Sequence, residues 1–162
     1  MIKTPYEQGK QQVQNAPERT EYYEALQALV PVLRNLPSRI VAIDGKSGVG
    51  KTTLGRFLAW RFNVTLLETD LFLIPAKGAL KYYMDGIDRA IQSRLDELPI
   101  IVEGVVSLRI LKELGHSVDY HIHVVCEEAG EVEELSNEIR AYERTFDPMN
   151  NANLVLNLPV ED

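Results

Sequence analysis

Apolar residues recur along this chain in two patterns, short and mostly apolar runs and stripes with helical spacing. The runs favour buried strands and cover residues 40–43, 64–68, 100–102, 120–125 and 154–158. The stripes favour amphipathic helices and lie between these runs. Because strands and helices alternate along the chain, the pattern predicts an α/β fold with a parallel sheet and helices on both faces.

The predicted helices begin near residues 17, 51, 85, 107 and 127, and the connecting loops include 75–78 and 147–153. Asp85 and Ser107 are residue types that cap helix N-termini, so we expect each to cap the helix that follows it. Pro31 should kink or interrupt the first helix. The acidic segment 127–134 is favourable at the N-terminal end of the last helix.

The length and composition of the chain limit its domain organisation, its binding partners and its cellular compartment. With 162 residues, the chain is long enough for one domain with a substantial buried core, predicted over 17–162, and the polar, glutamine-rich residues 1–16 predict a loose N-terminal arm. A formal charge of −7 argues against a nucleic-acid-binding surface, which needs clustered Lys and Arg. Cys126 is the only cysteine, so no intramolecular disulfide is expected. No apolar run approaches the roughly 18 residues of a membrane span and no signal peptide is visible, so we expect a cytoplasmic protein with no membrane partner.

A glycine-rich turn follows the first apolar run and opens directly into a helix. Gly45, Gly50, Lys51 and Thr52 fit the phosphate-binding spacing G-x-x-x-x-G-K-[ST]. The glycines let backbone N–H groups curl around an anion, and the helix N-terminus adds unpaired donors. Lys51 would reach the β- and γ-phosphates, and the Thr52 hydroxyl would bind Mg²⁺. The predicted nucleotide-binding residues are Gly45, Lys46, Ser47, Gly48, Val49, Gly50, Lys51, Thr52 and Thr53.

Two carboxylates follow the next two predicted strands. Asp70 lies just past the second strand and Glu103 ends the third. Since ligands of parallel sheets bind at the carboxyl ends of the strands, we expect both side chains to lie near the phosphate loop. There Lys51 and Mg²⁺ would neutralise the transferring phosphate, and Asp70 would orient the nucleophile and accept its proton.

The segments IDGKSGVGKTTL, TDLFL and IIVEGVVSL together resemble the P-loop kinases of small molecules, most closely the uridine kinase and phosphoribulokinase group. The resemblance covers about 40–125 and implies a three-layer P-loop NTPase fold, whose five-stranded parallel sheet has the order 2-3-1-4-5. It implies that Asp70 accepts the proton of the acceptor hydroxyl and that Glu103 lies near Mg²⁺, which makes Thr52 and Glu103 the predicted metal ligands. Such kinases carry an arginine-rich lid after the fourth strand. In this chain that segment is short, and Arg140 and Arg144 are its only arginines, so the resemblance makes these two the candidate catalytic residues of the lid.

Each candidate has a competing structural interpretation. Asp70 could cap a turn, and Glu103 could be a solvated residue at a strand end. Arg140 and Arg144 lie four residues apart among glutamates, which also favours surface ion pairs. For Arg109, a solvated side chain is favoured over a substrate contact.

Aromatic and histidine pairs have structural alternatives as well. Tyr82 and Tyr83 could wall an acceptor pocket or pack in the core. His121 and His123 share one strand face, but two histidines without further ligands do not predict a metal site.

The leading hypothesis is an ATP- and Mg²⁺-dependent kinase of a small hydroxyl-bearing metabolite, with nucleosides among the candidate acceptors. The alternative is a nucleotide-binding regulatory or adaptor protein that keeps the phosphate loop and lacks transferase activity; the short lid favours it, whereas Asp70 and Glu103 oppose it. No N-K-x-D guanine-recognition motif occurs, which disfavours a GTPase. The acceptor and the oligomeric state stay open, with a homo-oligomer among the options.

Overall fold

The computed structural model describes residues 19–128 and 133–159, so the arm expected over 1–16 lies outside the described residues. The helices are α2 (Thr20–Leu33), α3 (Lys51–Phe62), α4 (Met84–Leu95), α5 (Ser107–Glu113), α6 (Ser136–Phe146) and α7 (Pro148–Asn151), with short 3-10 helices η1 (Thr69–Phe72) and η2 (Glu133–Leu135). The strands are β1 (Ile40–Asp44), β2 (Thr65–Glu68), β3 (Leu73–Ile74), β4 (Lys81–Tyr82), β5 (Ile100–Glu103), β6 (Tyr120–Val125) and β7 (Leu154–Asn157).

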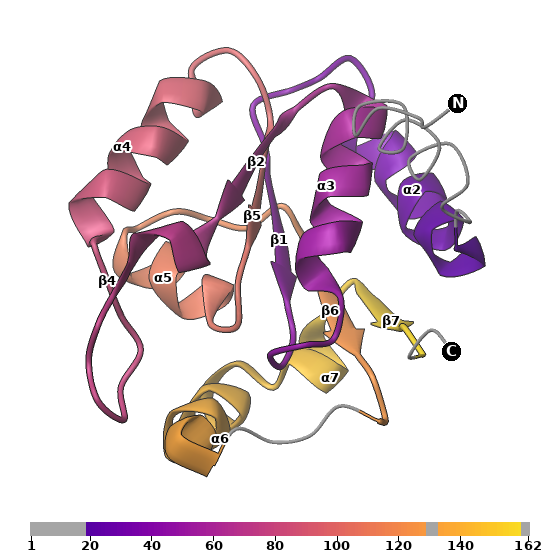
Figure 1. The fold of residues 1–162 in the computed structure, drawn as a ribbon. Coiled ribbons are helices and arrows are strands. Elements are labelled where there is room, and N and C mark those ends of the chain that lie inside the picture. The colour runs from indigo at the N-terminus through magenta and orange to yellow at the C-terminus, as the bar shows by residue number, and fades with distance from the viewer. Residues whose placement is uncertain (1–18, 129–132, 160–162) are drawn as a thin grey trace, which may run out of the picture.

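The main sheet has five parallel strands in the order β2-β5-β1-β6-β7. Counted along the chain within this sheet, that order is 2-3-1-4-5, which confirms the predicted topology. Helices α2 and α3 cover one face, and α4 and α5 cover the other (Figure 1). The chain therefore has the predicted three-layer α/β architecture, and β1 lies at the centre of the sheet.

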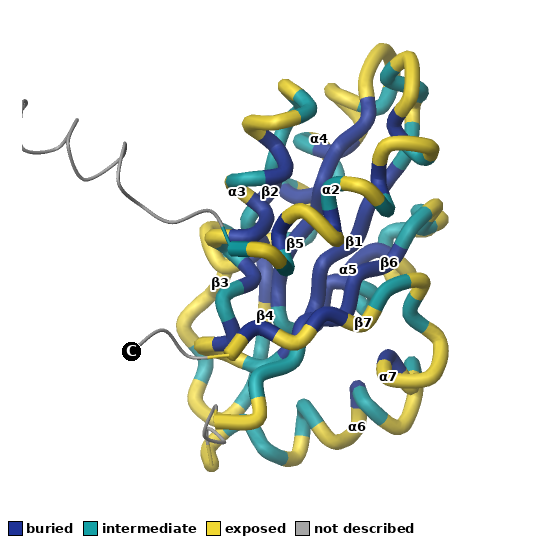
Figure 2. The backbone as a smooth tube through the Cα atoms, turned by 90° about the vertical axis from the view of Figure 1, so that its right-hand side faces the viewer, coloured by how far each residue is buried: buried dark blue, intermediate teal, exposed yellow. Residues whose placement is uncertain are grey.

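Alternate residues of β1 belong to two separate hydrophobic cores. Val41 and Ile43 pack with α2 and α3, whereas Ile40 and Ala42 pack with α4 and α5. All five residues of β1 are buried, as expected for a central parallel strand covered on both faces. Figure 2 shows this buried centre in dark blue, while most of α6 is exposed or intermediate. The buried centre of the sheet therefore leads directly into the predicted phosphate loop.

A two-stranded antiparallel hairpin, β3 with β4, was not predicted from the sequence. Each strand has only two residues, which is too short for an alternating pattern to be recognised. The hairpin follows η1 and precedes α4, so it forms the segment directly after Asp70.

Both predicted helix caps are wrong. The cap residue of α4 is Tyr83, Asp85 lies inside the first turn, and no side chain caps the helix. The cap residue of α5 is Val106, and the Ser107 hydroxyl donates to the carbonyl oxygen of Ile43 at 3.3 Å. Ser107 therefore links α5 to β1 and does not satisfy its own helix terminus.

Three further details of the helices differ from the predictions. Helix α2 continues through Pro31 to Leu33, so the proline does not interrupt it. Helix α6 begins at Ser136, later than the acidic segment suggested, and residues 129–132 are not described. The predicted loop 147–153 contains the short helix α7. Among the described residues, no helix has the length and apolar character needed to cross a membrane.

Candidate functional site

The turn between β1 and α3 places backbone N–H groups at the carboxyl edge of the sheet. Gly45 approaches the β6 backbone so closely that a Cβ atom there would collide with the carbonyl oxygen of Val124. Gly50 directly precedes α3, and its carbonyl oxygen accepts a hydrogen bond from the Leu54 N–H at 3.1 Å. The N–H groups of the first turn of α3 have no acceptor within the helix, so this edge offers donors to an anion.

The other residues of the predicted phosphate loop differ in exposure. Ser47, Gly48 and Thr53 are exposed, and Lys46 is half-buried. Val49 is 4 % exposed and belongs to the core formed with α2 and α3. The loop is therefore anchored by one apolar side chain, while its tip faces solvent.

Lys51 is buried beneath this loop. Its side chain is 7 % exposed, and its Nζ donates to the carbonyl oxygen of Lys46 at 2.8 Å. Burial lowers the pKa of Lys51, and the negative charges of Glu103, Asp70 and Asp44 oppose that effect. The Lys51 ammonium thus lies near three carboxylates at the carboxyl edge of the sheet.

Thr52 and Glu103 meet directly across the β1–β5 edge. The Thr52 hydroxyl donates to Glu103 Oε1 at 2.9 Å, and Glu103 is only 1 % exposed. Burial raises the pKa of Glu103, while the hydrogen bond from Thr52 and the charge of Lys51 act against it. Glu103 is therefore not the solvated strand-end residue of the competing interpretation.

Asp70 lies on η1 just past β2, and it is exposed. Its charge acts on the pKa values of both Lys51 and Glu103, so the three groups share one edge. The preceding residue, Thr69, is fully buried and packs against Gly104. A Cβ atom added at Gly104 would overlap the Thr69 hydroxyl. Close packing of η1 on the end of β5 therefore fixes the position from which Asp70 projects.

Glu68 is a further carboxylate at this edge that sequence reasoning missed. It is in register with Glu103 on the neighbouring strand. Arg56 of α3 binds both of its oxygens, at 2.7 and 3.0 Å. The only sequence signal was its place at a strand end, two residues before Asp70.

Arg140 and Arg144 lie on α6, which occupies the carboxyl edge of the sheet (Figure 1). Both side chains are exposed. Within residues 19–128 and 133–159, neither forms an ion pair, so the surface pairs of the competing interpretation are not formed there.

Arg109 is neither solvated nor free, contrary to the favoured interpretation of the sequence. It donates to Glu138 Oε2 of α6 at 3.2 Å and to the carbonyl oxygen of Leu80 at 3.0 Å. Glu138 also accepts the Leu80 N–H at 3.0 Å. These contacts join α5, α6 and the β3–β4 hairpin.

The two tyrosines of the hairpin differ. Tyr82 is 8 % exposed and belongs to the core formed with α4 and α5, and burial raises its pKa to about 12. Tyr83 is exposed. The core-packing interpretation therefore holds for Tyr82 and not for Tyr83.

A second polar cluster, missed by sequence reasoning, lies on the β6 side of β1. Asp44 is fully buried, and its Oδ1 contacts His121 Nε2 at 2.6 Å and His123 Nδ1 at 2.7 Å. The Tyr142 hydroxyl of α6 donates to Asp44 Oδ2 at 2.5 Å. Burial would raise the pKa of Asp44, but the hydrogen bonds from the two histidines and the tyrosine hold it below its ordinary value. The shared face of the histidines was predicted; the carboxylate that joins them was not.

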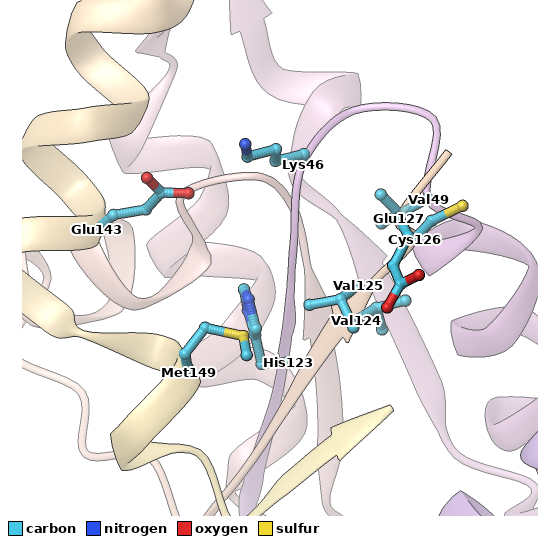
Figure 3. Close-up of a pocket in the computed structure, with 9 residues that line it drawn as sticks. All are labelled: Lys46, Val49, His123, Val124, Val125, Cys126, Glu127, Glu143 and Met149. Atoms are coloured by element: carbon cyan, nitrogen blue, oxygen red, sulfur yellow. The ribbon is translucent and has the colours of Figure 1, made fainter. Parts of the chain in front are cut away.

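A pocket of about 360 Å³ opens between the phosphate loop, the end of β6, α6 and α7. Figure 3 shows the residues around it: Lys46, Val49, His123, Val124, Val125, Cys126, Glu127, Glu143 and Met149. The pocket borders the phosphate loop on the β6 side, whereas Glu103 follows from β5 on the other side of β1. The loop therefore separates two regions that different parts of a ligand could occupy.

No protein-family model and no curated protein matches the sequence. Among solved structures, a possible uridine kinase from Bacillus stearothermophilus matches with a TM-score of 0.60 and 15 % identity, over 83 % of this chain and 96 % of that one. A proposed fructose transport system kinase from Silicibacter sp. TM1040 matches less well, with a TM-score of 0.49 and 15 % identity over 89 % of this chain and 100 % of that one. The chain therefore has the three-layer P-loop kinase fold, in the form seen in a possible uridine kinase.

Proposed function

We propose that this protein is an ATP-dependent phosphotransferase that phosphorylates a hydroxyl group of a small metabolite, with nucleosides among the candidate acceptors. The observation that carries the proposal is the gathering of four groups at one sheet edge. Lys51 and Thr52 open α3, Glu103 accepts a hydrogen bond from Thr52 at 2.9 Å, and the charge of Asp70 acts on both Lys51 and Glu103. Phosphoryl transfer needs this combination of positive charge, metal ligands and a carboxylate that orients the nucleophile.

The Thr52–Glu103 pair fits a magnesium ion. Neighbouring ligands of an octahedral ion with bonds of 2.0–2.1 Å lie about 3 Å apart. The observed separation of the two oxygens is 2.9 Å. Bound with the nucleotide, Mg²⁺ would supply charge neutralisation at the phosphates.

Lys51 and the phosphate loop would hold the phosphates of ATP. The Lys51 ammonium already lies under the loop, where it donates to a backbone carbonyl at 2.8 Å. A phosphate oxygen is a stronger acceptor than a carbonyl oxygen, so we expect Lys51 to exchange one for the other when ATP binds. The N–H groups at the start of α3 would complete the cradle.

Asp70 is the proposed base. The acceptor hydroxyl would attack the γ-phosphorus and give its proton to the Asp70 carboxylate. The bond from the γ-phosphorus to the bridging oxygen would break, leaving ADP. Because Asp70 is exposed at the sheet edge, an acceptor could reach it without displacing buried groups.

The two sides of the phosphate loop suggest where each substrate binds. The pocket beside Lys46 and Met149 could receive the nucleoside end of ATP. The acceptor would then lie on the opposite side, between Asp70 and the β3–β4 hairpin. Arg140 and Arg144 project from α6 at the same edge and are proposed to contact phosphate when α6 closes over the nucleotide.

The experiment that tests the proposal measures ADP formation from MgATP with a panel of nucleosides, sugars, vitamins and nucleotides. Wild type is compared with Asp70→Asn and with Asp85→Asn, which makes the same chemical change at an exposed position on α4. We expect acceptor-dependent ADP formation in wild type and Asp85→Asn and its loss in Asp70→Asn. MgATP binding by wild type without acceptor-dependent turnover across the panel would contradict the proposal.

A further inference from the structure

The structure assigns a further site to Asp44, His121 and His123: we infer that they bind one divalent transition-metal ion of the Zn²⁺ class, next to the phosphate loop. The three potential ligand atoms all lie within 4.8 Å of one another. They come from two neighbouring strands, since His123 is the register partner of Asp44 and His121 is that of Ala42. This site is separate from the Thr52–Glu103 pair and does not depend on the proposed phosphotransfer.

The chemistry of the three donors selects the class of ion. Two imidazole nitrogens and one carboxylate oxygen are the ligand types of Zn²⁺ and related transition metals. Mg²⁺ and Ca²⁺ prefer oxygen ligands throughout, so the histidines disfavour them. The sequence alone supplied only His121 and His123, and the fold adds the third ligand, Asp44.

Burial gives a physical reason for a cation at this position. Asp44 is 0 % exposed, His121 is 6 % exposed and His123 is 8 % exposed. With both imidazoles neutral, the cluster holds one negative charge away from water, which is costly without compensation. A divalent ion would compensate the carboxylate directly.

Binding changes the distances between ligand atoms by about 1.5 Å at most, because these atoms now lie within 4.8 Å of one another and would end about 3.3 Å apart. Ligands of a tetrahedral ion with bonds of 2.0–2.1 Å lie about 3.3 Å apart. The two nitrogens now lie 2.6 and 2.7 Å from Asp44 Oδ1, at hydrogen-bond distance. Each imidazole would give up the proton it shares with Asp44, keep a proton on its other ring nitrogen, and retreat by less than about 1 Å.

Tyr142 provides the outer shell of the site. Its hydroxyl donates to Asp44 Oδ2, which leaves Oδ1 directed at the histidines. Outer-shell hydrogen bonds of this kind orient the ligands of metal sites. Three protein ligands leave one position of a tetrahedral ion for water, and His123 also lines the pocket beside the phosphate loop.

The test is a titration of the purified full chain with Co²⁺ and with Zn²⁺, in buffer with excess Mg²⁺ to saturate oxygen-only sites. Calorimetry gives stoichiometry and affinity, and the visible absorption of Co²⁺ reports coordination by nitrogen and oxygen. We expect one ion per chain in wild type. His121→Gln and His123→Gln should each weaken binding at least about 100-fold, and Tyr142→Phe about 10- to 100-fold.

Two control variants locate the site. His116 is the third histidine and pairs with Asp88 at 2.6 Å, so His116→Gln removes an equivalent histidine–carboxylate contact elsewhere. Cys126 lines the neighbouring pocket, so Cys126→Ser tests for a thiolate ligand. Both variants should bind the ion as wild type does.

Several results would overturn the inference. No Co²⁺ or Zn²⁺ binding by folded wild type would leave the cluster as a hydrogen-bond network only. Binding that survives in both His121→Gln and His123→Gln, or that is lost in Cys126→Ser, would place the ion elsewhere. If a histidine variant fails to fold, the wild-type titration still tests whether the chain binds one ion.

Discussion

On the β5 side of β1, Glu103 and Thr52 meet beside the exposed carboxylate of Asp70, whereas on the β6 side Asp44 gathers three buried donors. Both regions lie at the carboxyl edge of the same sheet, and both touch the phosphate loop. They differ in access to water, because Asp70 is exposed while Asp44 is fully buried. The first region is open to solvent, as the proposed transfer to a substrate requires, whereas the second holds its polar groups away from water.

The largest effect should come from the exposed carboxylate. Asp70→Asn keeps the shape of the side chain and removes the base, so phosphate transfer should fall by roughly 10²–10⁴ while ATP affinity stays within a few-fold. Steady-state kinetics with the accepted substrate and calorimetry with ATP provide the two values. If Asp70→Asn unfolds the protein instead, Asp70 is a structural cap of its turn.

The next largest effect is expected on the free energy of unfolding, when the buried Asp44 cluster on the β6 side of β1 is changed. Asp44→Asn replaces an acceptor of three hydrogen bonds by a group that brings its own donors into a buried cluster, so the free energy of unfolding should fall by about 2–4 kcal/mol. Urea denaturation in metal-free buffer measures this change, and Asp85→Asn provides an exposed control near zero. A loss as small as that of the control would show that the cluster does not stabilise the fold.

A smaller change in free energy is expected for nucleotide binding. Lys51→Ala removes a charge-assisted contact to the phosphates and should weaken ATP binding by about 1.5–3 kcal/mol, or tenfold and more. Calorimetry with MgATP measures this change, and Lys81→Ala, which removes an exposed lysine of β4, is the control. Equal affinities in wild type and Lys51→Ala would rule out the assigned phosphate loop.

The smallest change in the free energy of unfolding should come from replacing the two arginines of α6. Alanine at both Arg140 and Arg144 should reduce turnover about tenfold or more, with the free energy of unfolding changed by less than about 0.5 kcal/mol, because both side chains are exposed. Kinetics and urea denaturation of the double variant test this pair of values. Normal turnover would leave both arginines as ordinary surface residues.

The contrast between the two regions also explains how much the sequence could predict. The predicted phosphate loop is local: Gly45, Gly50, Lys51 and Thr52 lie within eight consecutive positions, so spacing alone is enough to predict phosphate binding there. Asp70 and Glu103 were placed from strand ends, since parallel topology brings those ends to one edge. The sheet order came from family resemblance and is confirmed by the structure.

The β6-side cluster could not be predicted in the same way. His121 lies 77 positions from Asp44 and Tyr142 lies 98 positions from it, and only strand register and the docking of α6 bring them together. The helix caps failed for a related reason: residue type favours Ser107 as a cap, but its hydroxyl binds β1 instead. These contacts therefore depend on long-range packing, which residue type and local spacing do not predict.

The central claim is that the two carboxylates flanking the phosphate loop have different roles, Asp70 in phosphate transfer and Asp44 in structure. The most direct test measures the transfer rate per folded molecule for Asp70→Asn and Asp44→Asn, with the folded fraction of each taken from urea denaturation. We predict that Asp70→Asn loses roughly 10²–10⁴ of its rate while fully folded, and that Asp44→Asn loses stability but keeps a rate within about tenfold of wild type. Equal loss of rate per folded molecule in the two variants would contradict this division of roles.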